Sequence, residues 1–309
     1  MKKFILSCFV YFMIPVNIFA QGSIKLIVLG NVQDAGSPHI ACRKSCCKEL
    51  ILHPDINRKV VSLGLIDESS QTSYLFESTP DMPAQLKNLK KHTGIASKEL
   101  PDGIFITHAH IGHYTGLMYL GKEAMNAQHV KVFAMPKMKT FLEKNGPWSQ
   151  LVNTHNIDIQ SLTNNVPVQL NASIKITPFL VPHRDEYSET VGYLIEGPHK
   201  KVLFIPDIDK WEKWDKNIID ELSKVDFALI DATFYDKEEI NNRDIKEIPH
   251  PFIIESMELF STLPFEEKRK IFFIHLNHTN PALNELSTQT QIIKQNGFHV
   301  GRINDEFEL

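Results

Sequence analysis

Three histidines stand within six residues directly behind an apolar run. The run at 103–107 leads into His108-Ala109-His110-Ile111-Gly112-His113. Neutral imidazole is the commonest protein ligand for zinc and similar metals, so three such side chains at the end of a buried strand can converge on one ion. Isolated histidines are usually surface or core residues, whereas this spacing predicts a metal site.

The rest of the chain shows strand-like and helix-like segments in an irregular order. The strand-like runs lie at 24–29, 60–67, 73–77, 103–107, 130–135, 174–181, 190–196, 201–205, 227–230 and 270–274. Helical patterns lie at 82–91, 115–126, 137–145, 218–224 and 250–260. Helices scattered irregularly among runs of strands indicate sheets covered by helices, not one doubly wound parallel sheet. The expected class is α/β or α+β with a large β content.

Residues 1–20 have the pattern of a secretory signal peptide. Two lysines precede an apolar run at 4–19, and Ala20 resembles a small-residue cleavage site. A membrane anchor is the alternative, but Pro15 interrupts the run, which is short for a span of about 20 residues; lipidation of Cys8 is a minor alternative. We expect a periplasmic or secreted protein with no stable membrane insertion after cleavage.

The mature chain is expected to be one mildly acidic domain. No internal repeat, low-complexity tract or linker divides residues 21–309. The whole chain has 33 basic and 37 acidic residues; cleavage removes two lysines and no acid, so the formal net charge of the mature chain is 31 − 37 = −6. The densest basic stretches, 87–92 and 268–270, are typical of solvated helix faces. A small-molecule substrate is therefore expected, and a long nucleic acid is not.

The histidine cluster carries a family resemblance. Residues 107–117 read THAHIGHYTGL and resemble the HxHxDH motif of the metallo-β-lactamase superfamily. The resemblance implies an αββα sandwich, in which two β-sheets are flanked by helices. It also implies a third histidine ligand, a bridging aspartate and a last histidine at successive strand ends. His183, Asp207 and His275 occupy those places in the family's order.

One departure from the motif affects the second of the two metal positions that the resemblance implies. At the position of Gly112 the family has an aspartate, which binds the second metal and orients the attacking water. The first site is complete, with His108, His110, His183 and bridging Asp207. The second retains His113, His275 and a share of Asp207, so we expect it to be empty, weak, or completed by another group or by water. On this basis Gly112→Asp should raise its occupancy.

Within the superfamily, the chain is similar to the coenzyme PQQ biosynthesis protein B family and to the cyclic phosphodiesterase of phosphonate breakdown. The similarity rests on the first loop at 33–47, on Pro206-Asp207-Ile208-Asp209, and on HLNHTNP at 275–281. The phosphodiesterase implies hydrolysis of a small phosphodiester or related ester. The protein-B family, which also deviates in the histidine motif, implies an oxidative enzyme with iron. A metal-dependent binding protein without catalysis is a third hypothesis.

Hydrolysis would proceed by metal-bound hydroxide, because a divalent metal lowers the pKa of bound water to about 7. Asp207 would bridge the metals or balance their charge, and His250 and Asp209 are candidate proton donors to the leaving group. Both candidates are equally well explained as helix-start or surface residues. Asp34 in the first loop is a candidate for the border of the pocket. One or two zinc ions suit this ligand set, and so do iron or manganese.

The cysteines left after cleavage, Cys42, Cys46 and Cys47, lie within six residues. An odd cluster is not a disulfide framework and suggests a metal or a reactive thiol. The phosphodiesterase resemblance implies a structural zinc held by these thiolates and His278, a closed tetrahedral site. The alternative is one disulfide plus a free thiol, although adjacent cysteines pair with strain and a bridge from Cys42 to Cys46 closes a very short loop.

Overall fold

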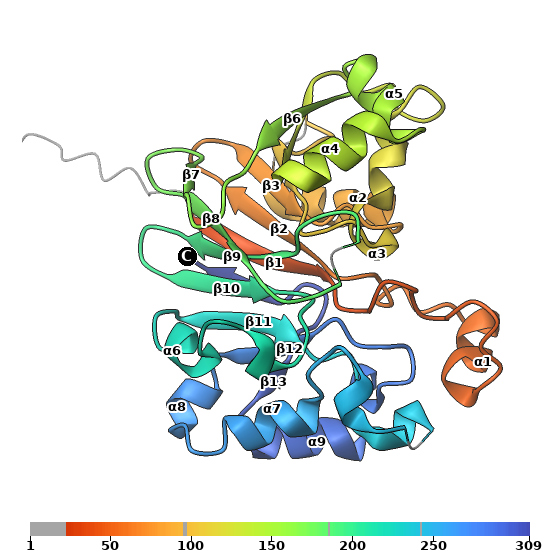
Figure 1. The fold of residues 1–309 in the computed structure, drawn as a ribbon, viewed down its shortest axis with the longest axis vertical. Helices are drawn as coiled ribbons and strands as arrows, with labels where there is room; N and C mark the ends of the chain where they lie inside the picture. Colours follow the sequence, from red (N-terminus) through yellow and green to blue (C-terminus); the bar gives the residue numbers. More distant parts are fainter. Residues whose placement is uncertain (1–22, 95–97, 185, 242) are drawn as a thin grey trace, which may run out of the picture.

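Two seven-stranded sheets pack face to face, with helices on their outer faces (Figure 1). The computed structural model describes residues 23–94, 98–184, 186–241 and 243–309. This arrangement confirms the αββα sandwich that the family resemblance implies. The expected signal peptide lies outside the described residues.

The first sheet has the strand order β14-β1-β2-β3-β4-β5-β6. Its strands are β1 (Ile24–Gly30), β2 (Ser62–Asp67), β3 (Thr72–Phe76), β4 (Gly103–Phe105), β5 (Val130–Ala134), β6 (Ile157–Ser161) and β14 (Glu306–Glu308). Strands β1 to β3 pair antiparallel, whereas β3 to β6 pair in parallel. All six residues of β2 are buried, because this strand is covered on both faces.

The second sheet has the order β13-β12-β11-β10-β9-β8-β7. Its strands are β7 (Val168–Gln169), β8 (Lys175–Leu180), β9 (Val191–Glu196), β10 (Lys201–Ile205), β11 (Phe227–Asp231), β12 (Ile271–Ile274) and β13 (His299–Val300). Strands β7 to β10 pair antiparallel, and β10 to β13 pair in parallel. The parallel strands therefore end at a common edge, and the loops that leave this edge lie close together.

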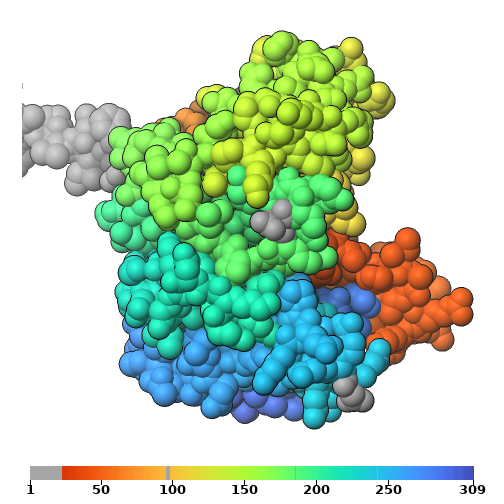
Figure 2. Space-filling model, in the orientation of Figure 1, coloured from red at the N-terminus to blue at the C-terminus, as the bar shows by residue number. Residues whose placement is uncertain are grey.

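Helices cover both outer faces, and one small lobe projects from the side. The α-helices are α1 (Ser45–Leu52), α2 (Met82–Thr93), α3 (Ile111–Tyr114), α4 (Pro136–Lys144), α5 (Trp148–Asn153), α6 (Ile218–Leu222), α7 (Ile253–Leu259), α8 (Phe265–Lys268) and α9 (Thr288–Gln295). Short 3-10 helices lie at Thr115–Leu120, Trp211–Lys213, Lys237–Ile240, Ile245–Glu247 and Pro281–Leu283. Figure 2 shows the lobe with α1, in orange-red, standing out beside the blue C-terminal part. Within the described residues, none of the helices has the length and apolar character to cross a membrane.

Aromatic side chains join the two sheets. Phe76 of β3 and Phe105 of β4 stack with ring centroids 5.0 Å apart, and Tyr193 of β9 meets Phe105 edge-on at 5.6 Å. The buried Tyr193 hydroxyl donates to the carbonyl of Ile106 at 2.6 Å, so this polar group is satisfied inside the apolar layer. These contacts fix the first sheet, just before the histidine cluster, against the second.

Two predicted helices differ from the structure. The segment 115–126 forms only a 3-10 helix over Thr115–Leu120, which ends where Gly121 takes an extended conformation with φ −72° and ψ 177°. The helix expected at 250–260 begins at Ile253, since Pro251 disfavours helical dihedrals in the preceding residue. Strands β6, β7, β13 and β14 and helices α1, α3, α5, α8 and α9 were not predicted.

Candidate metal centre

Loops behind strand ends carry the predicted metal ligands to one edge of the sheets. His108 follows β4, His183 follows β8, Asp207 follows β10 and His275 follows β12. The backbone of His275 has φ +60°, a left-handed conformation that is uncommon for histidine. Such strain persists where the surrounding structure holds a side chain in a functional position.

The first donor set consists of His108, His110, His183 and Asp207, with ligand atoms all within 4.8 Å of one another. The His108 Nε2 lies 2.9 Å from the His110 Nδ1, and the His183 Nε2 lies 3.3 Å from that same atom. The Asp207 Oδ2 is 3.4 Å from the His108 Nε2 and 3.2 Å from the His183 Nε2. Donors about 2.0–2.1 Å from a tetrahedral zinc lie about 3.3 Å from one another, so these four atoms fit one ion.

The second donor set consists of Asp34, His113, Asp207 and His275. The Asp34 Oδ1 lies 2.7 Å from the His113 Nε2 and 3.1 Å from the His275 Nε2. The Asp207 Oδ2 lies 3.8 and 3.9 Å from those two nitrogens, so one carboxylate oxygen faces both sets. The other oxygen of the buried Asp207, Oδ1, lies 3.2 Å from the His250 Nδ1.

Buried neighbours hold the far nitrogens of the imidazole rings. The Thr107 hydroxyl lies 2.9 Å from the His108 Nδ1, and the Glu77 Oε2 lies 3.5 Å from the His113 Nδ1. Glu77 is fully buried at the end of β3, with φ +73°. Partners of this kind fix the tautomer and orientation of ligating histidines. Sequence reasoning did not single out Glu77.

Asp231, the last residue of β11, is a buried carboxylate that the sequence analysis missed. Its Oδ2 lies 2.9 Å from the His250 Nδ1, and its Oδ1 lies 3.4 Å from the His275 Nδ1. The backbone N–H of Ile208 and both the N–H and the hydroxyl of Thr233 donate to the same carboxylate. Asp231 therefore holds two imidazoles of the centre in place. The signal that could have found it is the one that marks Asp207, an aspartate directly behind an apolar strand.

The two predicted proton donors lie in different positions. His250 lies inside the centre, where its Nδ1 is 3.2 Å from the Asp207 Oδ1 and 2.9 Å from the Asp231 Oδ2. Asp209 instead lies behind His183: its Oδ1 is 3.4 Å from the His183 Nδ1, the ring nitrogen that faces away from the donor set, and its Oδ2 pairs with Lys213. In this arrangement Asp209 positions His183, and its role as a proton donor stays a prediction.

Burial and carboxylates act in opposite directions on the imidazoles. Burial lowers the pKa of His108 well below its ordinary value, and burial also lowers that of His110. At His275 burial opposes protonation, but Asp207, Asp231 and Asp34 outweigh it and raise the pKa to about 9. At His250, Asp231 and Asp207 likewise outweigh burial and raise the pKa to about 10. A metal must therefore displace protons from part of this cluster.

Residual exposure marks the open side of the centre. The side chains of His108, His113, His183, Asp207 and His275 are at most 2% exposed. Asp34 and His250 retain 11% exposure, and His110 retains 15%. A reactant therefore reaches the centre past these last three side chains.

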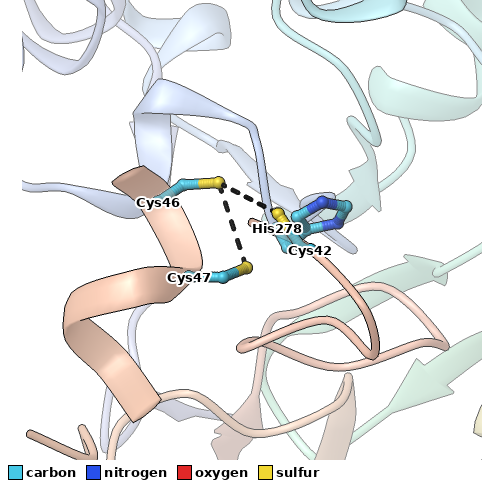
Figure 3. Close-up of side chains that lie close together, drawn as sticks. All are labelled: Cys42, Cys46, Cys47 and His278. Carbon is cyan, nitrogen blue, oxygen red and sulfur yellow. Dashed lines mark hydrogen bonds between the residues drawn. The ribbon is translucent and has the colours of Figure 1, made fainter. Parts of the chain in front are cut away.

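A separate cluster joins the projecting lobe to the segment behind β12 (Figure 3). Cys46 and Cys47 lie at the start of α1, Cys42 lies in the preceding loop, and His278 comes from the chain behind His275. The Cys46 Sγ is 3.9 Å from both other sulfurs, and all four ligand atoms lie within 4.8 Å of one another. Sulfurs about 2.3 Å from a tetrahedral zinc lie about 3.8 Å apart, so the geometry suits this ion.

The thiols are free, so the alternative of a disulfide is not what the structure contains. Burial, followed by His39 and Lys44, lowers the pKa of His278 to about 4, which leaves this imidazole neutral and able to ligate at pH 7. The His39 ring stacks on that of His278 at 4.4 Å, and the His39 N–H donates to the Cys47 sulfur. The cluster is thus held in place by its own loop.

Comparison with known proteins bears on this geometry. A family model described as a beta-lactamase superfamily domain matches residues 72–276, more than half of the chain. A coenzyme PQQ synthesis protein B from Klebsiella pneumoniae (strain 342) is 26% identical over 307 residues, which cover 88% of this chain and 94% of that protein. The protein of the same name from Xanthomonas axonopodis pv. citri (strain 306) is 23% identical and covers 92% of this chain and 100% of its own length.

Two solved structures share the fold over nearly the whole chain. Zn²⁺-bound PqqB from Methylobacterium extorquens has a TM-score of 0.75 at 20% identity and covers 92% of this chain and 100% of that one. A diphosphatase from the PhnP family has a TM-score of 0.64 at 19% identity and covers 93% and 97%. At these identities the likeness bears on the fold alone.

Proposed function

This chain belongs to the beta-lactamase superfamily, and we propose that it is an exported, metal-dependent hydrolase that acts on a small phosphodiester or related ester. The observation that carries the proposal is that two donor sets share one carboxylate oxygen, the Asp207 Oδ2. Paired metal positions joined in this way suit an in-line displacement, because both the attacking and the leaving oxygen can be stabilised.

His108, His110 and His183 would hold the first metal together with Asp207, and His113 and His275 would contribute to the second. A divalent metal bound there lowers the pKa of a coordinated water to about 7 and polarises the oxygen of the ester. Zinc is our first choice, because a zinc-bound PqqB shares the fold and four nitrogen and oxygen donors at tetrahedral spacing suit this ion. Iron and manganese suit the same donors.

His250 would protonate the leaving oxygen. Its Nδ1 is directed at Asp231 and Asp207, so the opposite nitrogen, Nε2, is the one that can reach a reactant on the open side. The buried Asp231 fixes the ring and, together with Asp207, keeps it protonated at neutral pH, so that a proton is available for the leaving oxygen. After the proton is transferred, the two carboxylates favour its replacement from solvent.

The surroundings of the centre favour a small substrate. The opening is lined by the edges of Asp34, His110 and His250, and the whole chain carries a formal net charge of −4. A polymer such as a long nucleic acid requires a continuous basic track for its phosphates. We therefore propose a low-molecular-weight ester in which one phosphoryl group enters the centre.

A second candidate is an oxidative enzyme with iron. The resemblance to the coenzyme PQQ synthesis protein B family implies it, and a third group of donors lies beside the two metal positions: Asp207, Asp231, His250 and His275. Two histidines with one carboxylate and open positions are a known iron arrangement. The hypothesis of a non-catalytic binding protein rested on a decayed second site, and it loses that basis because the second donor set retains two carboxylates and two imidazoles.

The test combines metal analysis with turnover. The purified protein would be stripped of metal, reloaded separately with Zn²⁺, Mn²⁺ or Fe²⁺, and screened against cyclic phosphodiesters, linear phosphodiesters and diphosphates. We expect hydrolysis with at least one metal, and we expect both activity and centre-bound metal to be lost in His110→Ala and Asp207→Ala. Oxygen consumption with Fe²⁺ and no hydrolysis with any metal would favour the oxidative enzyme. Unchanged metal content and turnover in both variants would show that the site is misassigned.

A further inference from the structure

The Asp34 carboxylate lies in the second donor set, although in the sequence it belongs to the first loop, far from Gly112. Its Oδ1 is 2.7 Å from the His113 Nε2 and 3.1 Å from the His275 Nε2, the nitrogens that also face Asp207. Asp34 thus supplies the second carboxylate of a set that otherwise has one.

Close packing links Asp34 to Gly112. A Cβ added at Gly112 would lie 2.5 Å from the Asp34 Cα, 2.8 Å from its Cβ and 2.9 Å from its Cγ. The Asp34 side chain therefore begins in the space that any side chain at 112 would need. The carboxylate of Asp34 can therefore occupy this space only because residue 112 is a glycine.

Backbone contacts hold Asp34 in this position. The Gln33 N–H donates to the carbonyl of Leu276 at 2.9 Å, and Val32 forms bridges with Val60 and Leu276. After Asp34, the Gly36 N–H donates back to the carbonyl of Gln33 at 2.9 Å and closes a turn. The loop is thus fastened to the segment that carries His275, so the carboxylate and this imidazole keep a constant spacing.

We propose that Asp34 is the carboxylate ligand of the second metal position and takes the role that a side chain at 112 would otherwise have. The proposal rests on the proposed metal-dependent function. It reverses the expectation that Gly112→Asp raises metal occupancy: the larger side chain would displace the loop and remove the ligand that is already there.

The test counts zinc in matched variants. Metal-stripped wild type, Asp34→Asn, Asp207→Ala and Asp55→Asn would be loaded with Zn²⁺ at pH 8, desalted and analysed for zinc per chain. Asparagine keeps the shape of Asp34 but removes its charge, and Asp55 is a partly exposed loop carboxylate paired with Arg58. We expect Asp34→Asn to hold one zinc fewer than wild type and Asp55→Asn to hold the wild-type number. Circular dichroism would verify the fold, and Co²⁺ loading would show the first-site bands retained in Asp34→Asn.

The ligand role of Asp34 and the metal-dependent function are contradicted by different results. If Asp34→Asn keeps the wild-type zinc number while Asp207→Ala loses zinc, Asp34 is not a ligand and the metal centre stands. If Asp207→Ala also keeps the wild-type number, the proposed metal-dependent function fails with it. If the centre of the wild type holds a single zinc that Asp34→Asn retains, the second position does not exist and the inference is overturned.

Discussion

Gly112→Ala is the smallest change that should damage the metal centre without removing a ligand. The added Cβ would lie 2.5 Å from the Asp34 Cα, whereas carbon atoms in contact are about 3.5–4.0 Å apart, so the loop must retreat by about 1 Å. Overpacking of this kind costs about 1–3 kcal/mol of unfolding free energy. Metal–ligand distances tolerate only about ±0.2 Å, so we expect Asp34 to leave the second metal position.

The expected functional loss follows from the same displacement. A misplacement of about 1 Å at a reacting centre reduces turnover about 100-fold. Isothermal titration of the metal-stripped protein with Zn²⁺ should show weaker binding at the second metal position, with binding at the first position and at the cysteine cluster unchanged. Gly146→Ala is the matched control, because a Cβ added there meets no atom within 4 Å.

If Gly112→Ala binds its second Zn²⁺ with wild-type affinity and turns over substrate at the wild-type rate, the contact between Gly112 and Asp34 does not control the centre. A crystal structure of the variant would then show how the loop accommodates the methyl group without moving the carboxylate.

Four further predictions address other parts of the account. Asp231→Asn should lower kcat about 100-fold or more with metal content retained, because His250 would lose the carboxylate that raises its pKa and a general acid contributes about 10²–10⁴-fold to the rate. Loss of metal instead would indicate a purely structural role for Asp231. Cys46→Ser should lower the melting temperature and remove one zinc per chain, and a disulfide found in this cluster by mass spectrometry of the native protein would contradict it. As pH falls from about 9, zinc should leave the second position first, because nearby carboxylates outweigh burial at both of its histidines and raise the pKa of His275 to about 9 and that of His113 above its ordinary value, whereas in the first position they do so only at His183 and burial lowers the pKa of His108 and His110; simultaneous loss measured by zinc analysis across pH would argue against this order. Cell fractionation should find the mature chain outside the cytoplasm with Gln21 at its N-terminus, and an intact Met1 in a cytoplasmic protein would exclude export.

The histidine cluster from His108 to His113 could be predicted from its spacing directly behind an apolar strand. His183, Asp207 and His275 were assigned through the family resemblance, which places a ligand at each of these strand ends, and the structure brings all of them together. Strand ends on one edge of a sheet lie close together in space, so this part of the site can be predicted from the sequence alone. The same rule applies to Asp231, which was missed although it directly follows an apolar run.

The remaining residues depend on packing that no local pattern records. Asp34 lies in a loop whose position is fixed by contacts with Leu276 and Val60, and nothing in its own segment indicates that it meets His113. Asp209 shares the loop of Asp207 but is directed to the opposite side of His183. For the same reason Gly112 was interpreted as a lost ligand, although the structure shows that its missing side chain makes room for another carboxylate.

Anomalous diffraction from zinc-loaded crystals tests the central claim most directly. We predict one zinc peak between His108, His110, His183 and Asp207, and a second between Asp34, His113, His275 and Asp207, with the Asp207 Oδ2 in contact with both ions. The absence of any peak within this cluster after zinc loading, in crystals whose side chains keep the arrangement described, would contradict the account.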